Sequence, residues 1–577
     1  MSPKSCHVAR LTLKRPQAYG LLSALFIALF VMGCQGRIVD ETADPTNPPL
    51  EPGDPNEPPG PEVCDESRRG SGNKHARRLT EVELRNTLRD LFGPSLYDVV
   101  ATSTAVLPSE SFGFHPERFA SSLSGSHVDA IVTVSNALAL AAASDASFVD
   151  RYGECGTLES EECVDGFLSQ FMPRALRGPV SDEERGRYLD AWRSEGDVAM
   201  LIQAVLLSPR FLMLVEEGEP QNERFRLTDF EIASRISYRA VSTMPDDELW
   251  AVAQRGELST LGQVRVQVER LLGSDAGKAH IRSFFHSWFE VEDLPAVSVS
   301  NAYRGDLDVL PLYSDALQDF DRFIDYIVWE ADGTFRDLFV DKSVFPTTDA
   351  LASVYGVSAS EDGSRRTATT PHQGIFLRAA SLMGGTDHSP IIHRGVMMRQ
   401  RLLCDELGQP DQEVISARDD DETPEDTDRT TRTNRQVIGH ITRRTTCMGC
   451  HARINPLGFA LENFDSLARW TTEEQVFEGD ELVATHPIDA RSDELVIEEG
   501  GVSEVDGAVE LVEAFLQGDK LRQCFARSLL RYQLYRFTAA DDGCLLIEQD
   551  AILDADESVY EFFVHSIAND DLFWRAR

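Results

Sequence analysis

The sequence has 577 residues, which is too long for one hydrophobic core and predicts roughly three to five packed units. Its formal net charge of −41 excludes the basic stripes with which proteins contact phosphate backbones, so no nucleic-acid partner is expected. Apolar residues make up 42% of the chain, which is ordinary for a globular protein, so most of it is expected to fold.

The first 34 residues have the pattern of a bacterial export signal. Four basic residues precede an apolar run from Tyr19 to Met32, which is too short and wrongly flanked for an ordinary membrane span. The sequence Val31-Met32-Gly33-Cys34 resembles a lipoprotein cleavage box, which implies that Cys34 becomes the lipidated N-terminus; a plain secretory signal is the alternative. We therefore expect membrane lipid as a partner and an extracytoplasmic protein anchored to a bacterial membrane, with the outer membrane favoured.

Residues 35–70 are expected to be a tether. They are acidic and rich in proline, and they offer little that a core could bury. Proline-rich linkers are extended and fairly stiff, so this one would hold the folded part away from a membrane surface.

Helix signals dominate from residue 71 onward. Thr80 to Glu83 forms a capping box with leucines placed for a hydrophobic staple, and Gly93 marks the end of that helix. Capping boxes recur at Ser181 to Glu184 and at Thr228 to Glu231. Each of them predicts the start of a helix.

Three further stretches have helical patterns. Residues 202–212 predict a buried helix that turns at Ser208-Pro209, and Ile281–Phe289 and Ser314–Glu330 predict helices rich in aromatic residues. Core packing is the expected role of these aromatic side chains. The only strand-like region is Glu481–Glu499, which predicts one small hairpin with its turn at Asp489.

The sequence Cys447-Met448-Gly449-Cys450-His451 is the C-x-x-C-H pattern of covalent haem c attachment. Two thiols one helical turn apart can each add to a haem vinyl group, and the adjacent imidazole can ligate the iron. The spacing therefore predicts haem c held by Cys447 and Cys450, with His451 as the proximal iron ligand. A chance match is one alternative, and a structural zinc knot completed by His440 is another.

The sequence does not identify the second axial ligand of the iron. Many c-type carriers use a downstream methionine, but no methionine follows Met448. His440 is the leading candidate for this distal position. Further candidates are His388, His393, Met397, Met398, His486 and His565.

The remaining cysteines predict disulfides in an oxidising compartment. Sequence alone does not choose among the possible pairings of six cysteines, and only Cys155–Cys163 is favoured, because the two residues are close. The others are Cys64, Cys404, Cys524 and Cys544.

Two acidic features flank the haem motif. Asp419–Arg429 is expected to be a solvated loop, with a calcium site as the alternative, although its spacing matches no EF-hand loop. Glu462 and Asp465 are one helical turn apart, and we expect them to cap or salt-bridge the helices; a proton relay is the alternative.

These signals predict a mainly α fold of multi-helical bundle modules, with a cytochrome c-like C-terminal module and at most a small β-hairpin. The expected segments are a signal peptide (1–34), a tether (35–70), helical modules (71–148, 149–218 and 219–360), the haem-motif module (361–475) and a C-terminal helical module (476–577).

Six segments carry a resemblance to a known family: His75–Gly93, Leu206–Leu212, Tyr238–Leu249, His393–Cys404, Cys447–Asp465 and Cys524–Arg536. Together they resemble a family of large secreted bacterial proteins built from adjoining domains of unknown function and grouped with planctomycete-type cytochrome c proteins. The resemblance implies secretion and haem c, but no particular activity. Asn455 departs from the family's usual Asp, the acidic loop replaces a proline-rich stretch, and Tyr535-Arg536 replaces a Gly-Arg pair. His440 matches the family's pattern.

Three functions fit these observations. Electron transfer by a single haem, with a redox partner protein that the sequence does not identify, is favoured. The alternatives are a peroxidase-like haem oxidoreductase with an open iron position, and a structural or binding protein with a Cys/His metal knot. Catalytic residues stay unknown, because the sequence has no G-x-S-x-G elbow, H-E-x-x-H motif or phosphate-binding glycine loop.

Overall fold

A computed structural model describes Cys64 and residues 76–103, 125–153, 155–222, 224–291, 299–408, 427–498 and 503–575. The chain divides into two compact units, Met1–Glu57 and Pro58–Arg577, and all described residues belong to the second. The expected signal peptide with Cys34, the tether apart from Cys64, and most of the acidic loop lie outside the described residues.

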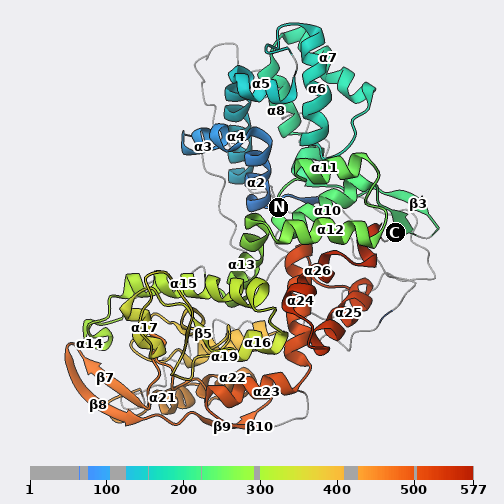
Figure 1. The fold of residues 1–577 in the computed structure, drawn as a ribbon. Coiled ribbons are helices and arrows are strands. Elements are labelled where there is room, and N and C mark those ends of the chain that lie inside the picture. Colours follow the sequence, from blue (N-terminus) through green and yellow to red (C-terminus); the bar gives the residue numbers. More distant parts are fainter. Residues whose placement is uncertain are drawn as a thin grey trace, which may run out of the picture. The chain divides into compact units, whose positions relative to one another are not determined.

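The fold is mainly α, as predicted (Figure 1). One buried apolar cluster is formed by the helices between residues 81 and 212, together with Tyr238 and Met244. These helices are α2 (Glu81–Phe92), α3 (Pro94–Ser103), α4 (Gly125–Ser144), α5 (Ala146–Tyr152), α6 (Glu161–Ala175), α7 (Asp182–Glu195), α8 (Val198–Leu206) and α9 (Pro209–Leu212). Among the described residues α4 alone is long and apolar enough to cross a membrane, and it packs against α3, α5 and α8.

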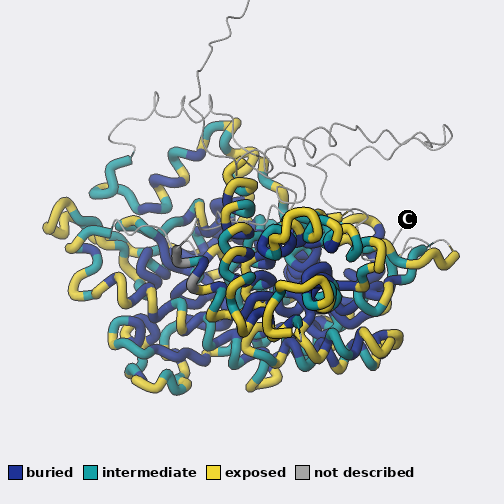
Figure 2. The backbone as a smooth tube through the Cα atoms, turned by 90° about the horizontal axis from the view of Figure 1, so that it is seen from above, coloured by how far each residue is buried: buried dark blue, intermediate teal, exposed yellow. Residues whose placement is uncertain are grey.

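A second buried cluster gathers apolar residues from Leu227 to Phe573. Its helices are α10 (Asp229–Val241), α11 (Asp247–Gln254), α12 (Leu261–Leu272), α13 (Asp275–Phe289), α14 (Asn301–Arg304), α15 (Val309–Asp325), α16 (Phe335–Val340), α17 (Asp349–Tyr355), α18 (Ala379–Leu382), α19 (Ile391–Met397), α22 (Thr445–Phe459), α23 (Ala508–Gln517), α24 (Lys520–Leu534), α25 (Gly543–Asp554) and α26 (Val559–Ile567). Helix α21 (Asn434–Ile441) adds no residue to this cluster and packs against α19 and α22. Helices α15 and α19 continue as the π-helical turns η2 (Tyr326–Glu330) and η3 (Met398–Leu402). Buried and exposed residues alternate along most helices (Figure 2), as expected where one face covers a core.

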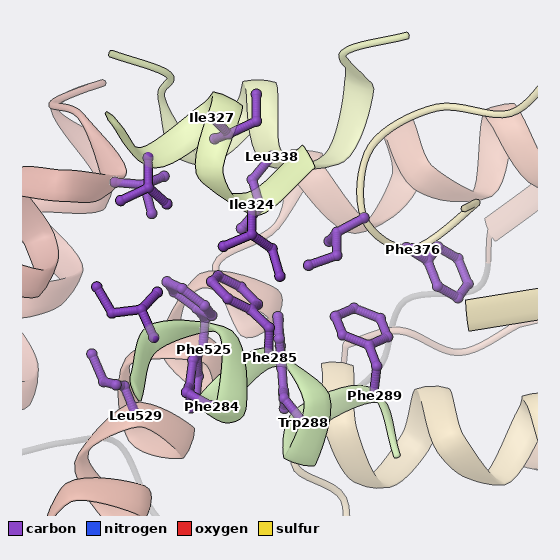
Figure 3. Packing of buried hydrophobic residues seen from close by; sticks show 14 of the residues in the cluster. Phe284, Phe285, Trp288, Phe289, Ile324, Ile327, Leu338, Phe376, Phe525 and Leu529 are labelled. Carbon is purple, nitrogen blue, oxygen red and sulfur yellow. The ribbon is translucent and has the colours of Figure 1, made fainter. Parts of the chain in front are cut away.

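Aromatic side chains lie at the centre of the second cluster, as predicted. Phe284, Phe285 and Trp288 of α13 are buried and meet Phe525 of α24 (Figure 3). The rings of Trp288 and Phe525 are 5.0 Å apart, and the indole Nε1 donates to the carbonyl of Arg401 at 2.7 Å. Residues more than 100 positions apart along the chain therefore share one core.

The helix starts follow the predicted capping signals with one exception. Thr80 and Thr228 each form a complete capping box with the glutamate three residues later. Ser181 caps α7, but Glu184 does not complete the box, because its carboxylate accepts a hydrogen bond from Arg210 Nη1 at 2.7 Å. Competition from a nearby guanidinium explains this difference.

The strands form only two- and three-stranded sheets in the described residues. They are β1 (Arg77–Arg78), β2 (Met213–Leu214), β3 (Glu219–Gln221), β4 (Arg224–Arg226), β5 (Ser343–Val344), β6 (Arg366–Thr367), β7 (Glu473–Glu478), β8 (Glu481–Pro487), β9 (Arg491–Leu495), β10 (Ser503–Asp506) and β11 (Trp574–Arg575). The predicted hairpin with its turn at Asp489 is wrong: β8 pairs with β7, and β9 pairs with β10. The first of these hairpins turns at Gly479, whose φ of 61° suits a tight turn.

Three disulfides cross-link the described chain: Cys64–Cys544, Cys155–Cys163 and Cys404–Cys524. The pair expected from its closeness is present, and the other two join residues 480 and 120 positions apart. Cys447 and Cys450 are the free cysteines of the described residues.

Candidate haem attachment site

The C-x-x-C-H motif lies in the first half of α22. Cys447 is half-buried and Cys450 is exposed, and both are free thiols. Because the helix rises about 1.5 Å and turns about 100° per residue, positions three apart lie on the same face. The fold therefore presents two free thiols together at its surface, while the structural cysteines are held in disulfides.

The imidazole of His451 is oriented by the helix that carries it. Its Nδ1 lies 2.9 Å from Oδ1 of Asn455, one turn further on. The amide nitrogen of Asn455 donates to Oγ1 of Thr442 at 2.8 Å, and that hydroxyl donates to the carbonyl of Ile438 at 2.7 Å. Since the Thr442 proton is already used, Thr442 can only accept from the amide, so the oxygen of Asn455 faces His451.

This chain of hydrogen bonds selects one tautomer of His451. A carbonyl-type oxygen accepts, so Nδ1 must carry the proton and Nε2 keeps its lone pair for a metal. Asn455 and Thr442 are buried, which protects the contacts from competing water. The two thiols and an imidazole ready to ligate through Nε2 are the groups that haem c needs, so the residues present fit this cofactor.

The second half of α22 is packed tightly against α19. A Cβ added to Gly395 would lie 2.3 Å from the carbonyl oxygen of Ile454, and one added to Gly458 would lie 2.2 Å from that of Ile391. Only glycine at both positions permits this approach. The helix is therefore fixed at its buried end and exposed at the end that carries the motif.

A buried arginine holds the chain that leaves α22. The guanidinium of Arg394 donates to the carbonyls of Leu461, Phe464 and Asp465 at 3.1, 2.6 and 2.8 Å. Burial lowers the pKa of Arg394 to about 10. Hydrogen bonds to main-chain oxygens partly replace its hydration.

The zinc knot, which was the alternative to haem c, is not supported by the arrangement of the side chains. Among the described residues, which include His440, Cys447, Cys450 and His451, no group of three or more His, Cys, Asp or Glu side chains is placed to hold a metal ion. His440 lies half-buried near the end of α21, which packs against α22.

The other distal-ligand candidates are dispersed. Nε2 of His486 on β8 lies 2.8 Å from the carbonyl of Arg429, and His565 of α26 lies 4.0 Å from Glu548. Met397 and Met398 are buried at the junction of α19 and η3. His393 lies on α19, and His388 lies in the loop before it.

The two carboxylates after the motif have different roles. Asp465 accepts from the main chain of Leu467 and Arg469 and pairs with the Arg469 side chain at 2.6 Å, as expected of a capping residue. Glu462 differs from the expectation, because its buried Oε2 has no hydrogen-bond partner in the described part of the chain. Burial raises the pKa of Glu462 to about 8.

Two features of the site were not predicted. The contact between His451 and Asn455 has the i, i+4 spacing of neighbours on a helix, so the sequence held a signal for it. Thr442 precedes α22 and reaches Asn455 only through the turn between α21 and α22, which no local pattern reveals.

Three family models match adjoining parts of the chain. Residues 163–216 match PSD5, a protein of unknown function (DUF1595), and residues 227–357 match PSD4, a protein of unknown function (DUF1592). Residues 372–474 match PSCyt3, a protein of unknown function (DUF1588), and this range contains all of α22. No curated protein and no solved structure matches the chain.

Proposed function

Because the chain belongs to the multi-domain planctomycete cytochrome c-type family, which joins these domains of unknown function, we propose that it is an extracytoplasmic c-type haem protein that transfers electrons. The observation that carries the proposal is the free thiol pair of Cys447 and Cys450 beside an imidazole whose Nε2 is left available. In this proposal Cys34 anchors the protein to membrane lipid, and a second protein exchanges electrons with the site.

Each residue of the site has a defined role in this function. The thiols of Cys447 and Cys450 would hold the haem as thioethers, and Nε2 of His451 would ligate its iron. When bound, haem supplies a one-electron carrier whose potential depends on its axial ligands and their hydrogen bonds. Asn455 would fix the ring plane of His451 and increase its basicity.

Optical redox titration of the mature protein, followed by addition of peroxide, tests electron transfer against the peroxidase-like alternative. A carrier gives one reversible one-electron transition, a low-spin spectrum and no turnover of peroxide. A high-spin spectrum with peroxide turnover would instead support an open iron position. That alternative is considered because no methionine follows Met448.

The variants Asn455→Ala and Asn455→Asp are expected to shift the reduction potential in opposite directions. Loss of the acceptor makes the His451 ring a weaker electron donor and raises the potential, whereas a carboxylate makes the ring a stronger donor and lowers it. Potentiometry measures both shifts at unchanged haem content. Asn463→Ala is the control, because Asn463 bonds the carbonyl of Thr471 instead. Equal potentials in all variants would contradict the role of Asn455.

Replacement of Cys34 by alanine is expected to release the protein from membranes. Acylation needs the Cys34 thiol. Without the lipid anchor the whole protein should move from the membrane fraction to the aqueous fraction. Fractionation of cells that express the variant measures this, with the unchanged protein as the control. Continued sedimentation of the variant with membranes would show that another feature tethers the chain.

A further inference from the structure

A polar cavity lies at the far end of α22 from the haem motif. Its volume is about 240 Å³. Its wall comes from α14, the loop before α19, the start of α21, the chain that runs from the end of α22 into β7, and the residue after β8. The lining includes five carboxyl side chains and one guanidinium. That guanidinium, of Arg469, is already paired with Asp465. The cavity therefore has an excess of negative charge.

Glu462 distinguishes this cavity from an ordinary acidic surface. It exposes only 6% of its surface, lines the cavity, and leaves its buried Oε2 without a hydrogen-bond partner among the described residues. An ionised carboxylate buried without a hydrogen-bond donor costs free energy, and a positive charge held in the adjoining cavity would lower that cost.

The rest of the lining offers acceptors more than donors. The side-chain amide nitrogen of Asn434 donates to the carbonyl of Ser389, and its main-chain N–H donates to the carboxylate of Glu474. Trp470 is 42% exposed and lines the same cavity, so an aromatic surface is available beside the carboxylates. Aromatic faces attract cations as well as apolar groups.

From these contacts we propose that the cavity binds a small organic cation through a primary ammonium group. Its three N–H donors would satisfy Glu462 and the neighbouring carboxylates of Asp387 and Glu474, and its carbon chain would lie against Trp470. An anion is excluded by the charge of the lining. A neutral polyol would leave that charge uncompensated, and no set of side chains for a metal ion is present in the described residues.

The proposal also predicts a pH dependence. Burial raises the pKa of Glu462 to about 8, and a cation binds the carboxylate, so affinity should rise as pH increases through that value. Burial lowers the pKa of His388, which faces the same space, to about 4, so His388 stays neutral there. Burial also raises the pKa of Glu474. The other charged groups that act on Glu462 are Arg435, Asp489 and Arg394.

Calorimetric titration of the mature protein with n-butylammonium chloride tests the proposal, roughly one pH unit below and above the pKa of Glu462. Binding should be tighter at the higher pH. Glu462→Gln keeps the size of the side chain and should weaken binding at least about tenfold while removing the pH dependence. Glu478→Gln, an exposed change at the end of strand β7 and outside the lining of the cavity, should leave affinity unchanged.

Methyl glucoside and calcium chloride are the comparison probes. The proposal is overturned by preferential binding of either one, by butylammonium binding that Glu462→Gln does not weaken, or by no heat from butylammonium at millimolar concentration. None of these outcomes depends on the haem, so the proposed electron transfer stands or falls separately.

Discussion

The double variant Cys447→Ala/Cys450→Ala is expected to carry no covalent haem. Each thioether needs one of these thiols, and the remaining described cysteines are held in disulfides, so no substitute is near. The fold should persist, because Cys450 is exposed, Cys447 is half-buried, and alanine favours the helix. The intact mass of the secreted protein measures haem loss, and circular dichroism measures retained helix.

The matched control is Cys155→Ala/Cys163→Ala, which also removes two cysteines. It removes a disulfide between two residues that are close in sequence, and the protein should still show the added mass of bound haem. A full haem complement in the Cys447→Ala/Cys450→Ala variant would place the attachment site elsewhere.

Gly458→Ala and Gly395→Ala are expected to destabilise the packing of α22 on α19 by about 3 kcal/mol each. The added methyl group would meet a main-chain carbonyl oxygen at 2.2 or 2.3 Å, and a backbone cannot move aside as a flexible side chain can. Separation of the helices would also disturb the contact between Asn455 and His451. Hydrogen exchange of peptides from α19 and α22 measures this locally, which suits a chain of several modules.

Gly439→Ala is the control, because nothing lies within 4 Å of a Cβ at this exposed position of α21. It should leave exchange unchanged or slow it slightly, since alanine favours a helix over glycine by about 1 kcal/mol. Slow exchange in Gly458→Ala equal to that of the unchanged protein would mean that the close approach of α19 and α22 is not required.

Local signals predicted the helices well. The capping boxes at Thr80 and Thr228 involve only residues within one turn, so the sequence contains the whole interaction. Strand pairing failed because it is not local. The turn that sets the register is Gly479-Asp480, a two-residue hairpin signal, rather than the polar stretch at Asp489.

The candidate site also has a part that local sequence predicts and a part that depends on contacts between distant segments. The thiols and His451 follow from the spacing within one helix, whereas Thr442 enters only through the turn between two helices. The pairings Cys64–Cys544 and Cys404–Cys524 depend on how distant segments pack, which composition does not encode. The cavity at Glu462 is likewise assembled from five separate stretches of chain.

The most direct test of covalent haem at Cys447 and Cys450 is a visible absorption spectrum. The mature protein is purified from a host competent in haem c maturation and measured before and after dithionite, then again after extraction with acid–acetone. We expect sharp α and β bands in the reduced protein that persist through extraction. A folded, secreted protein without a Soret band, or one that loses its colour to the solvent, would contradict the central claim.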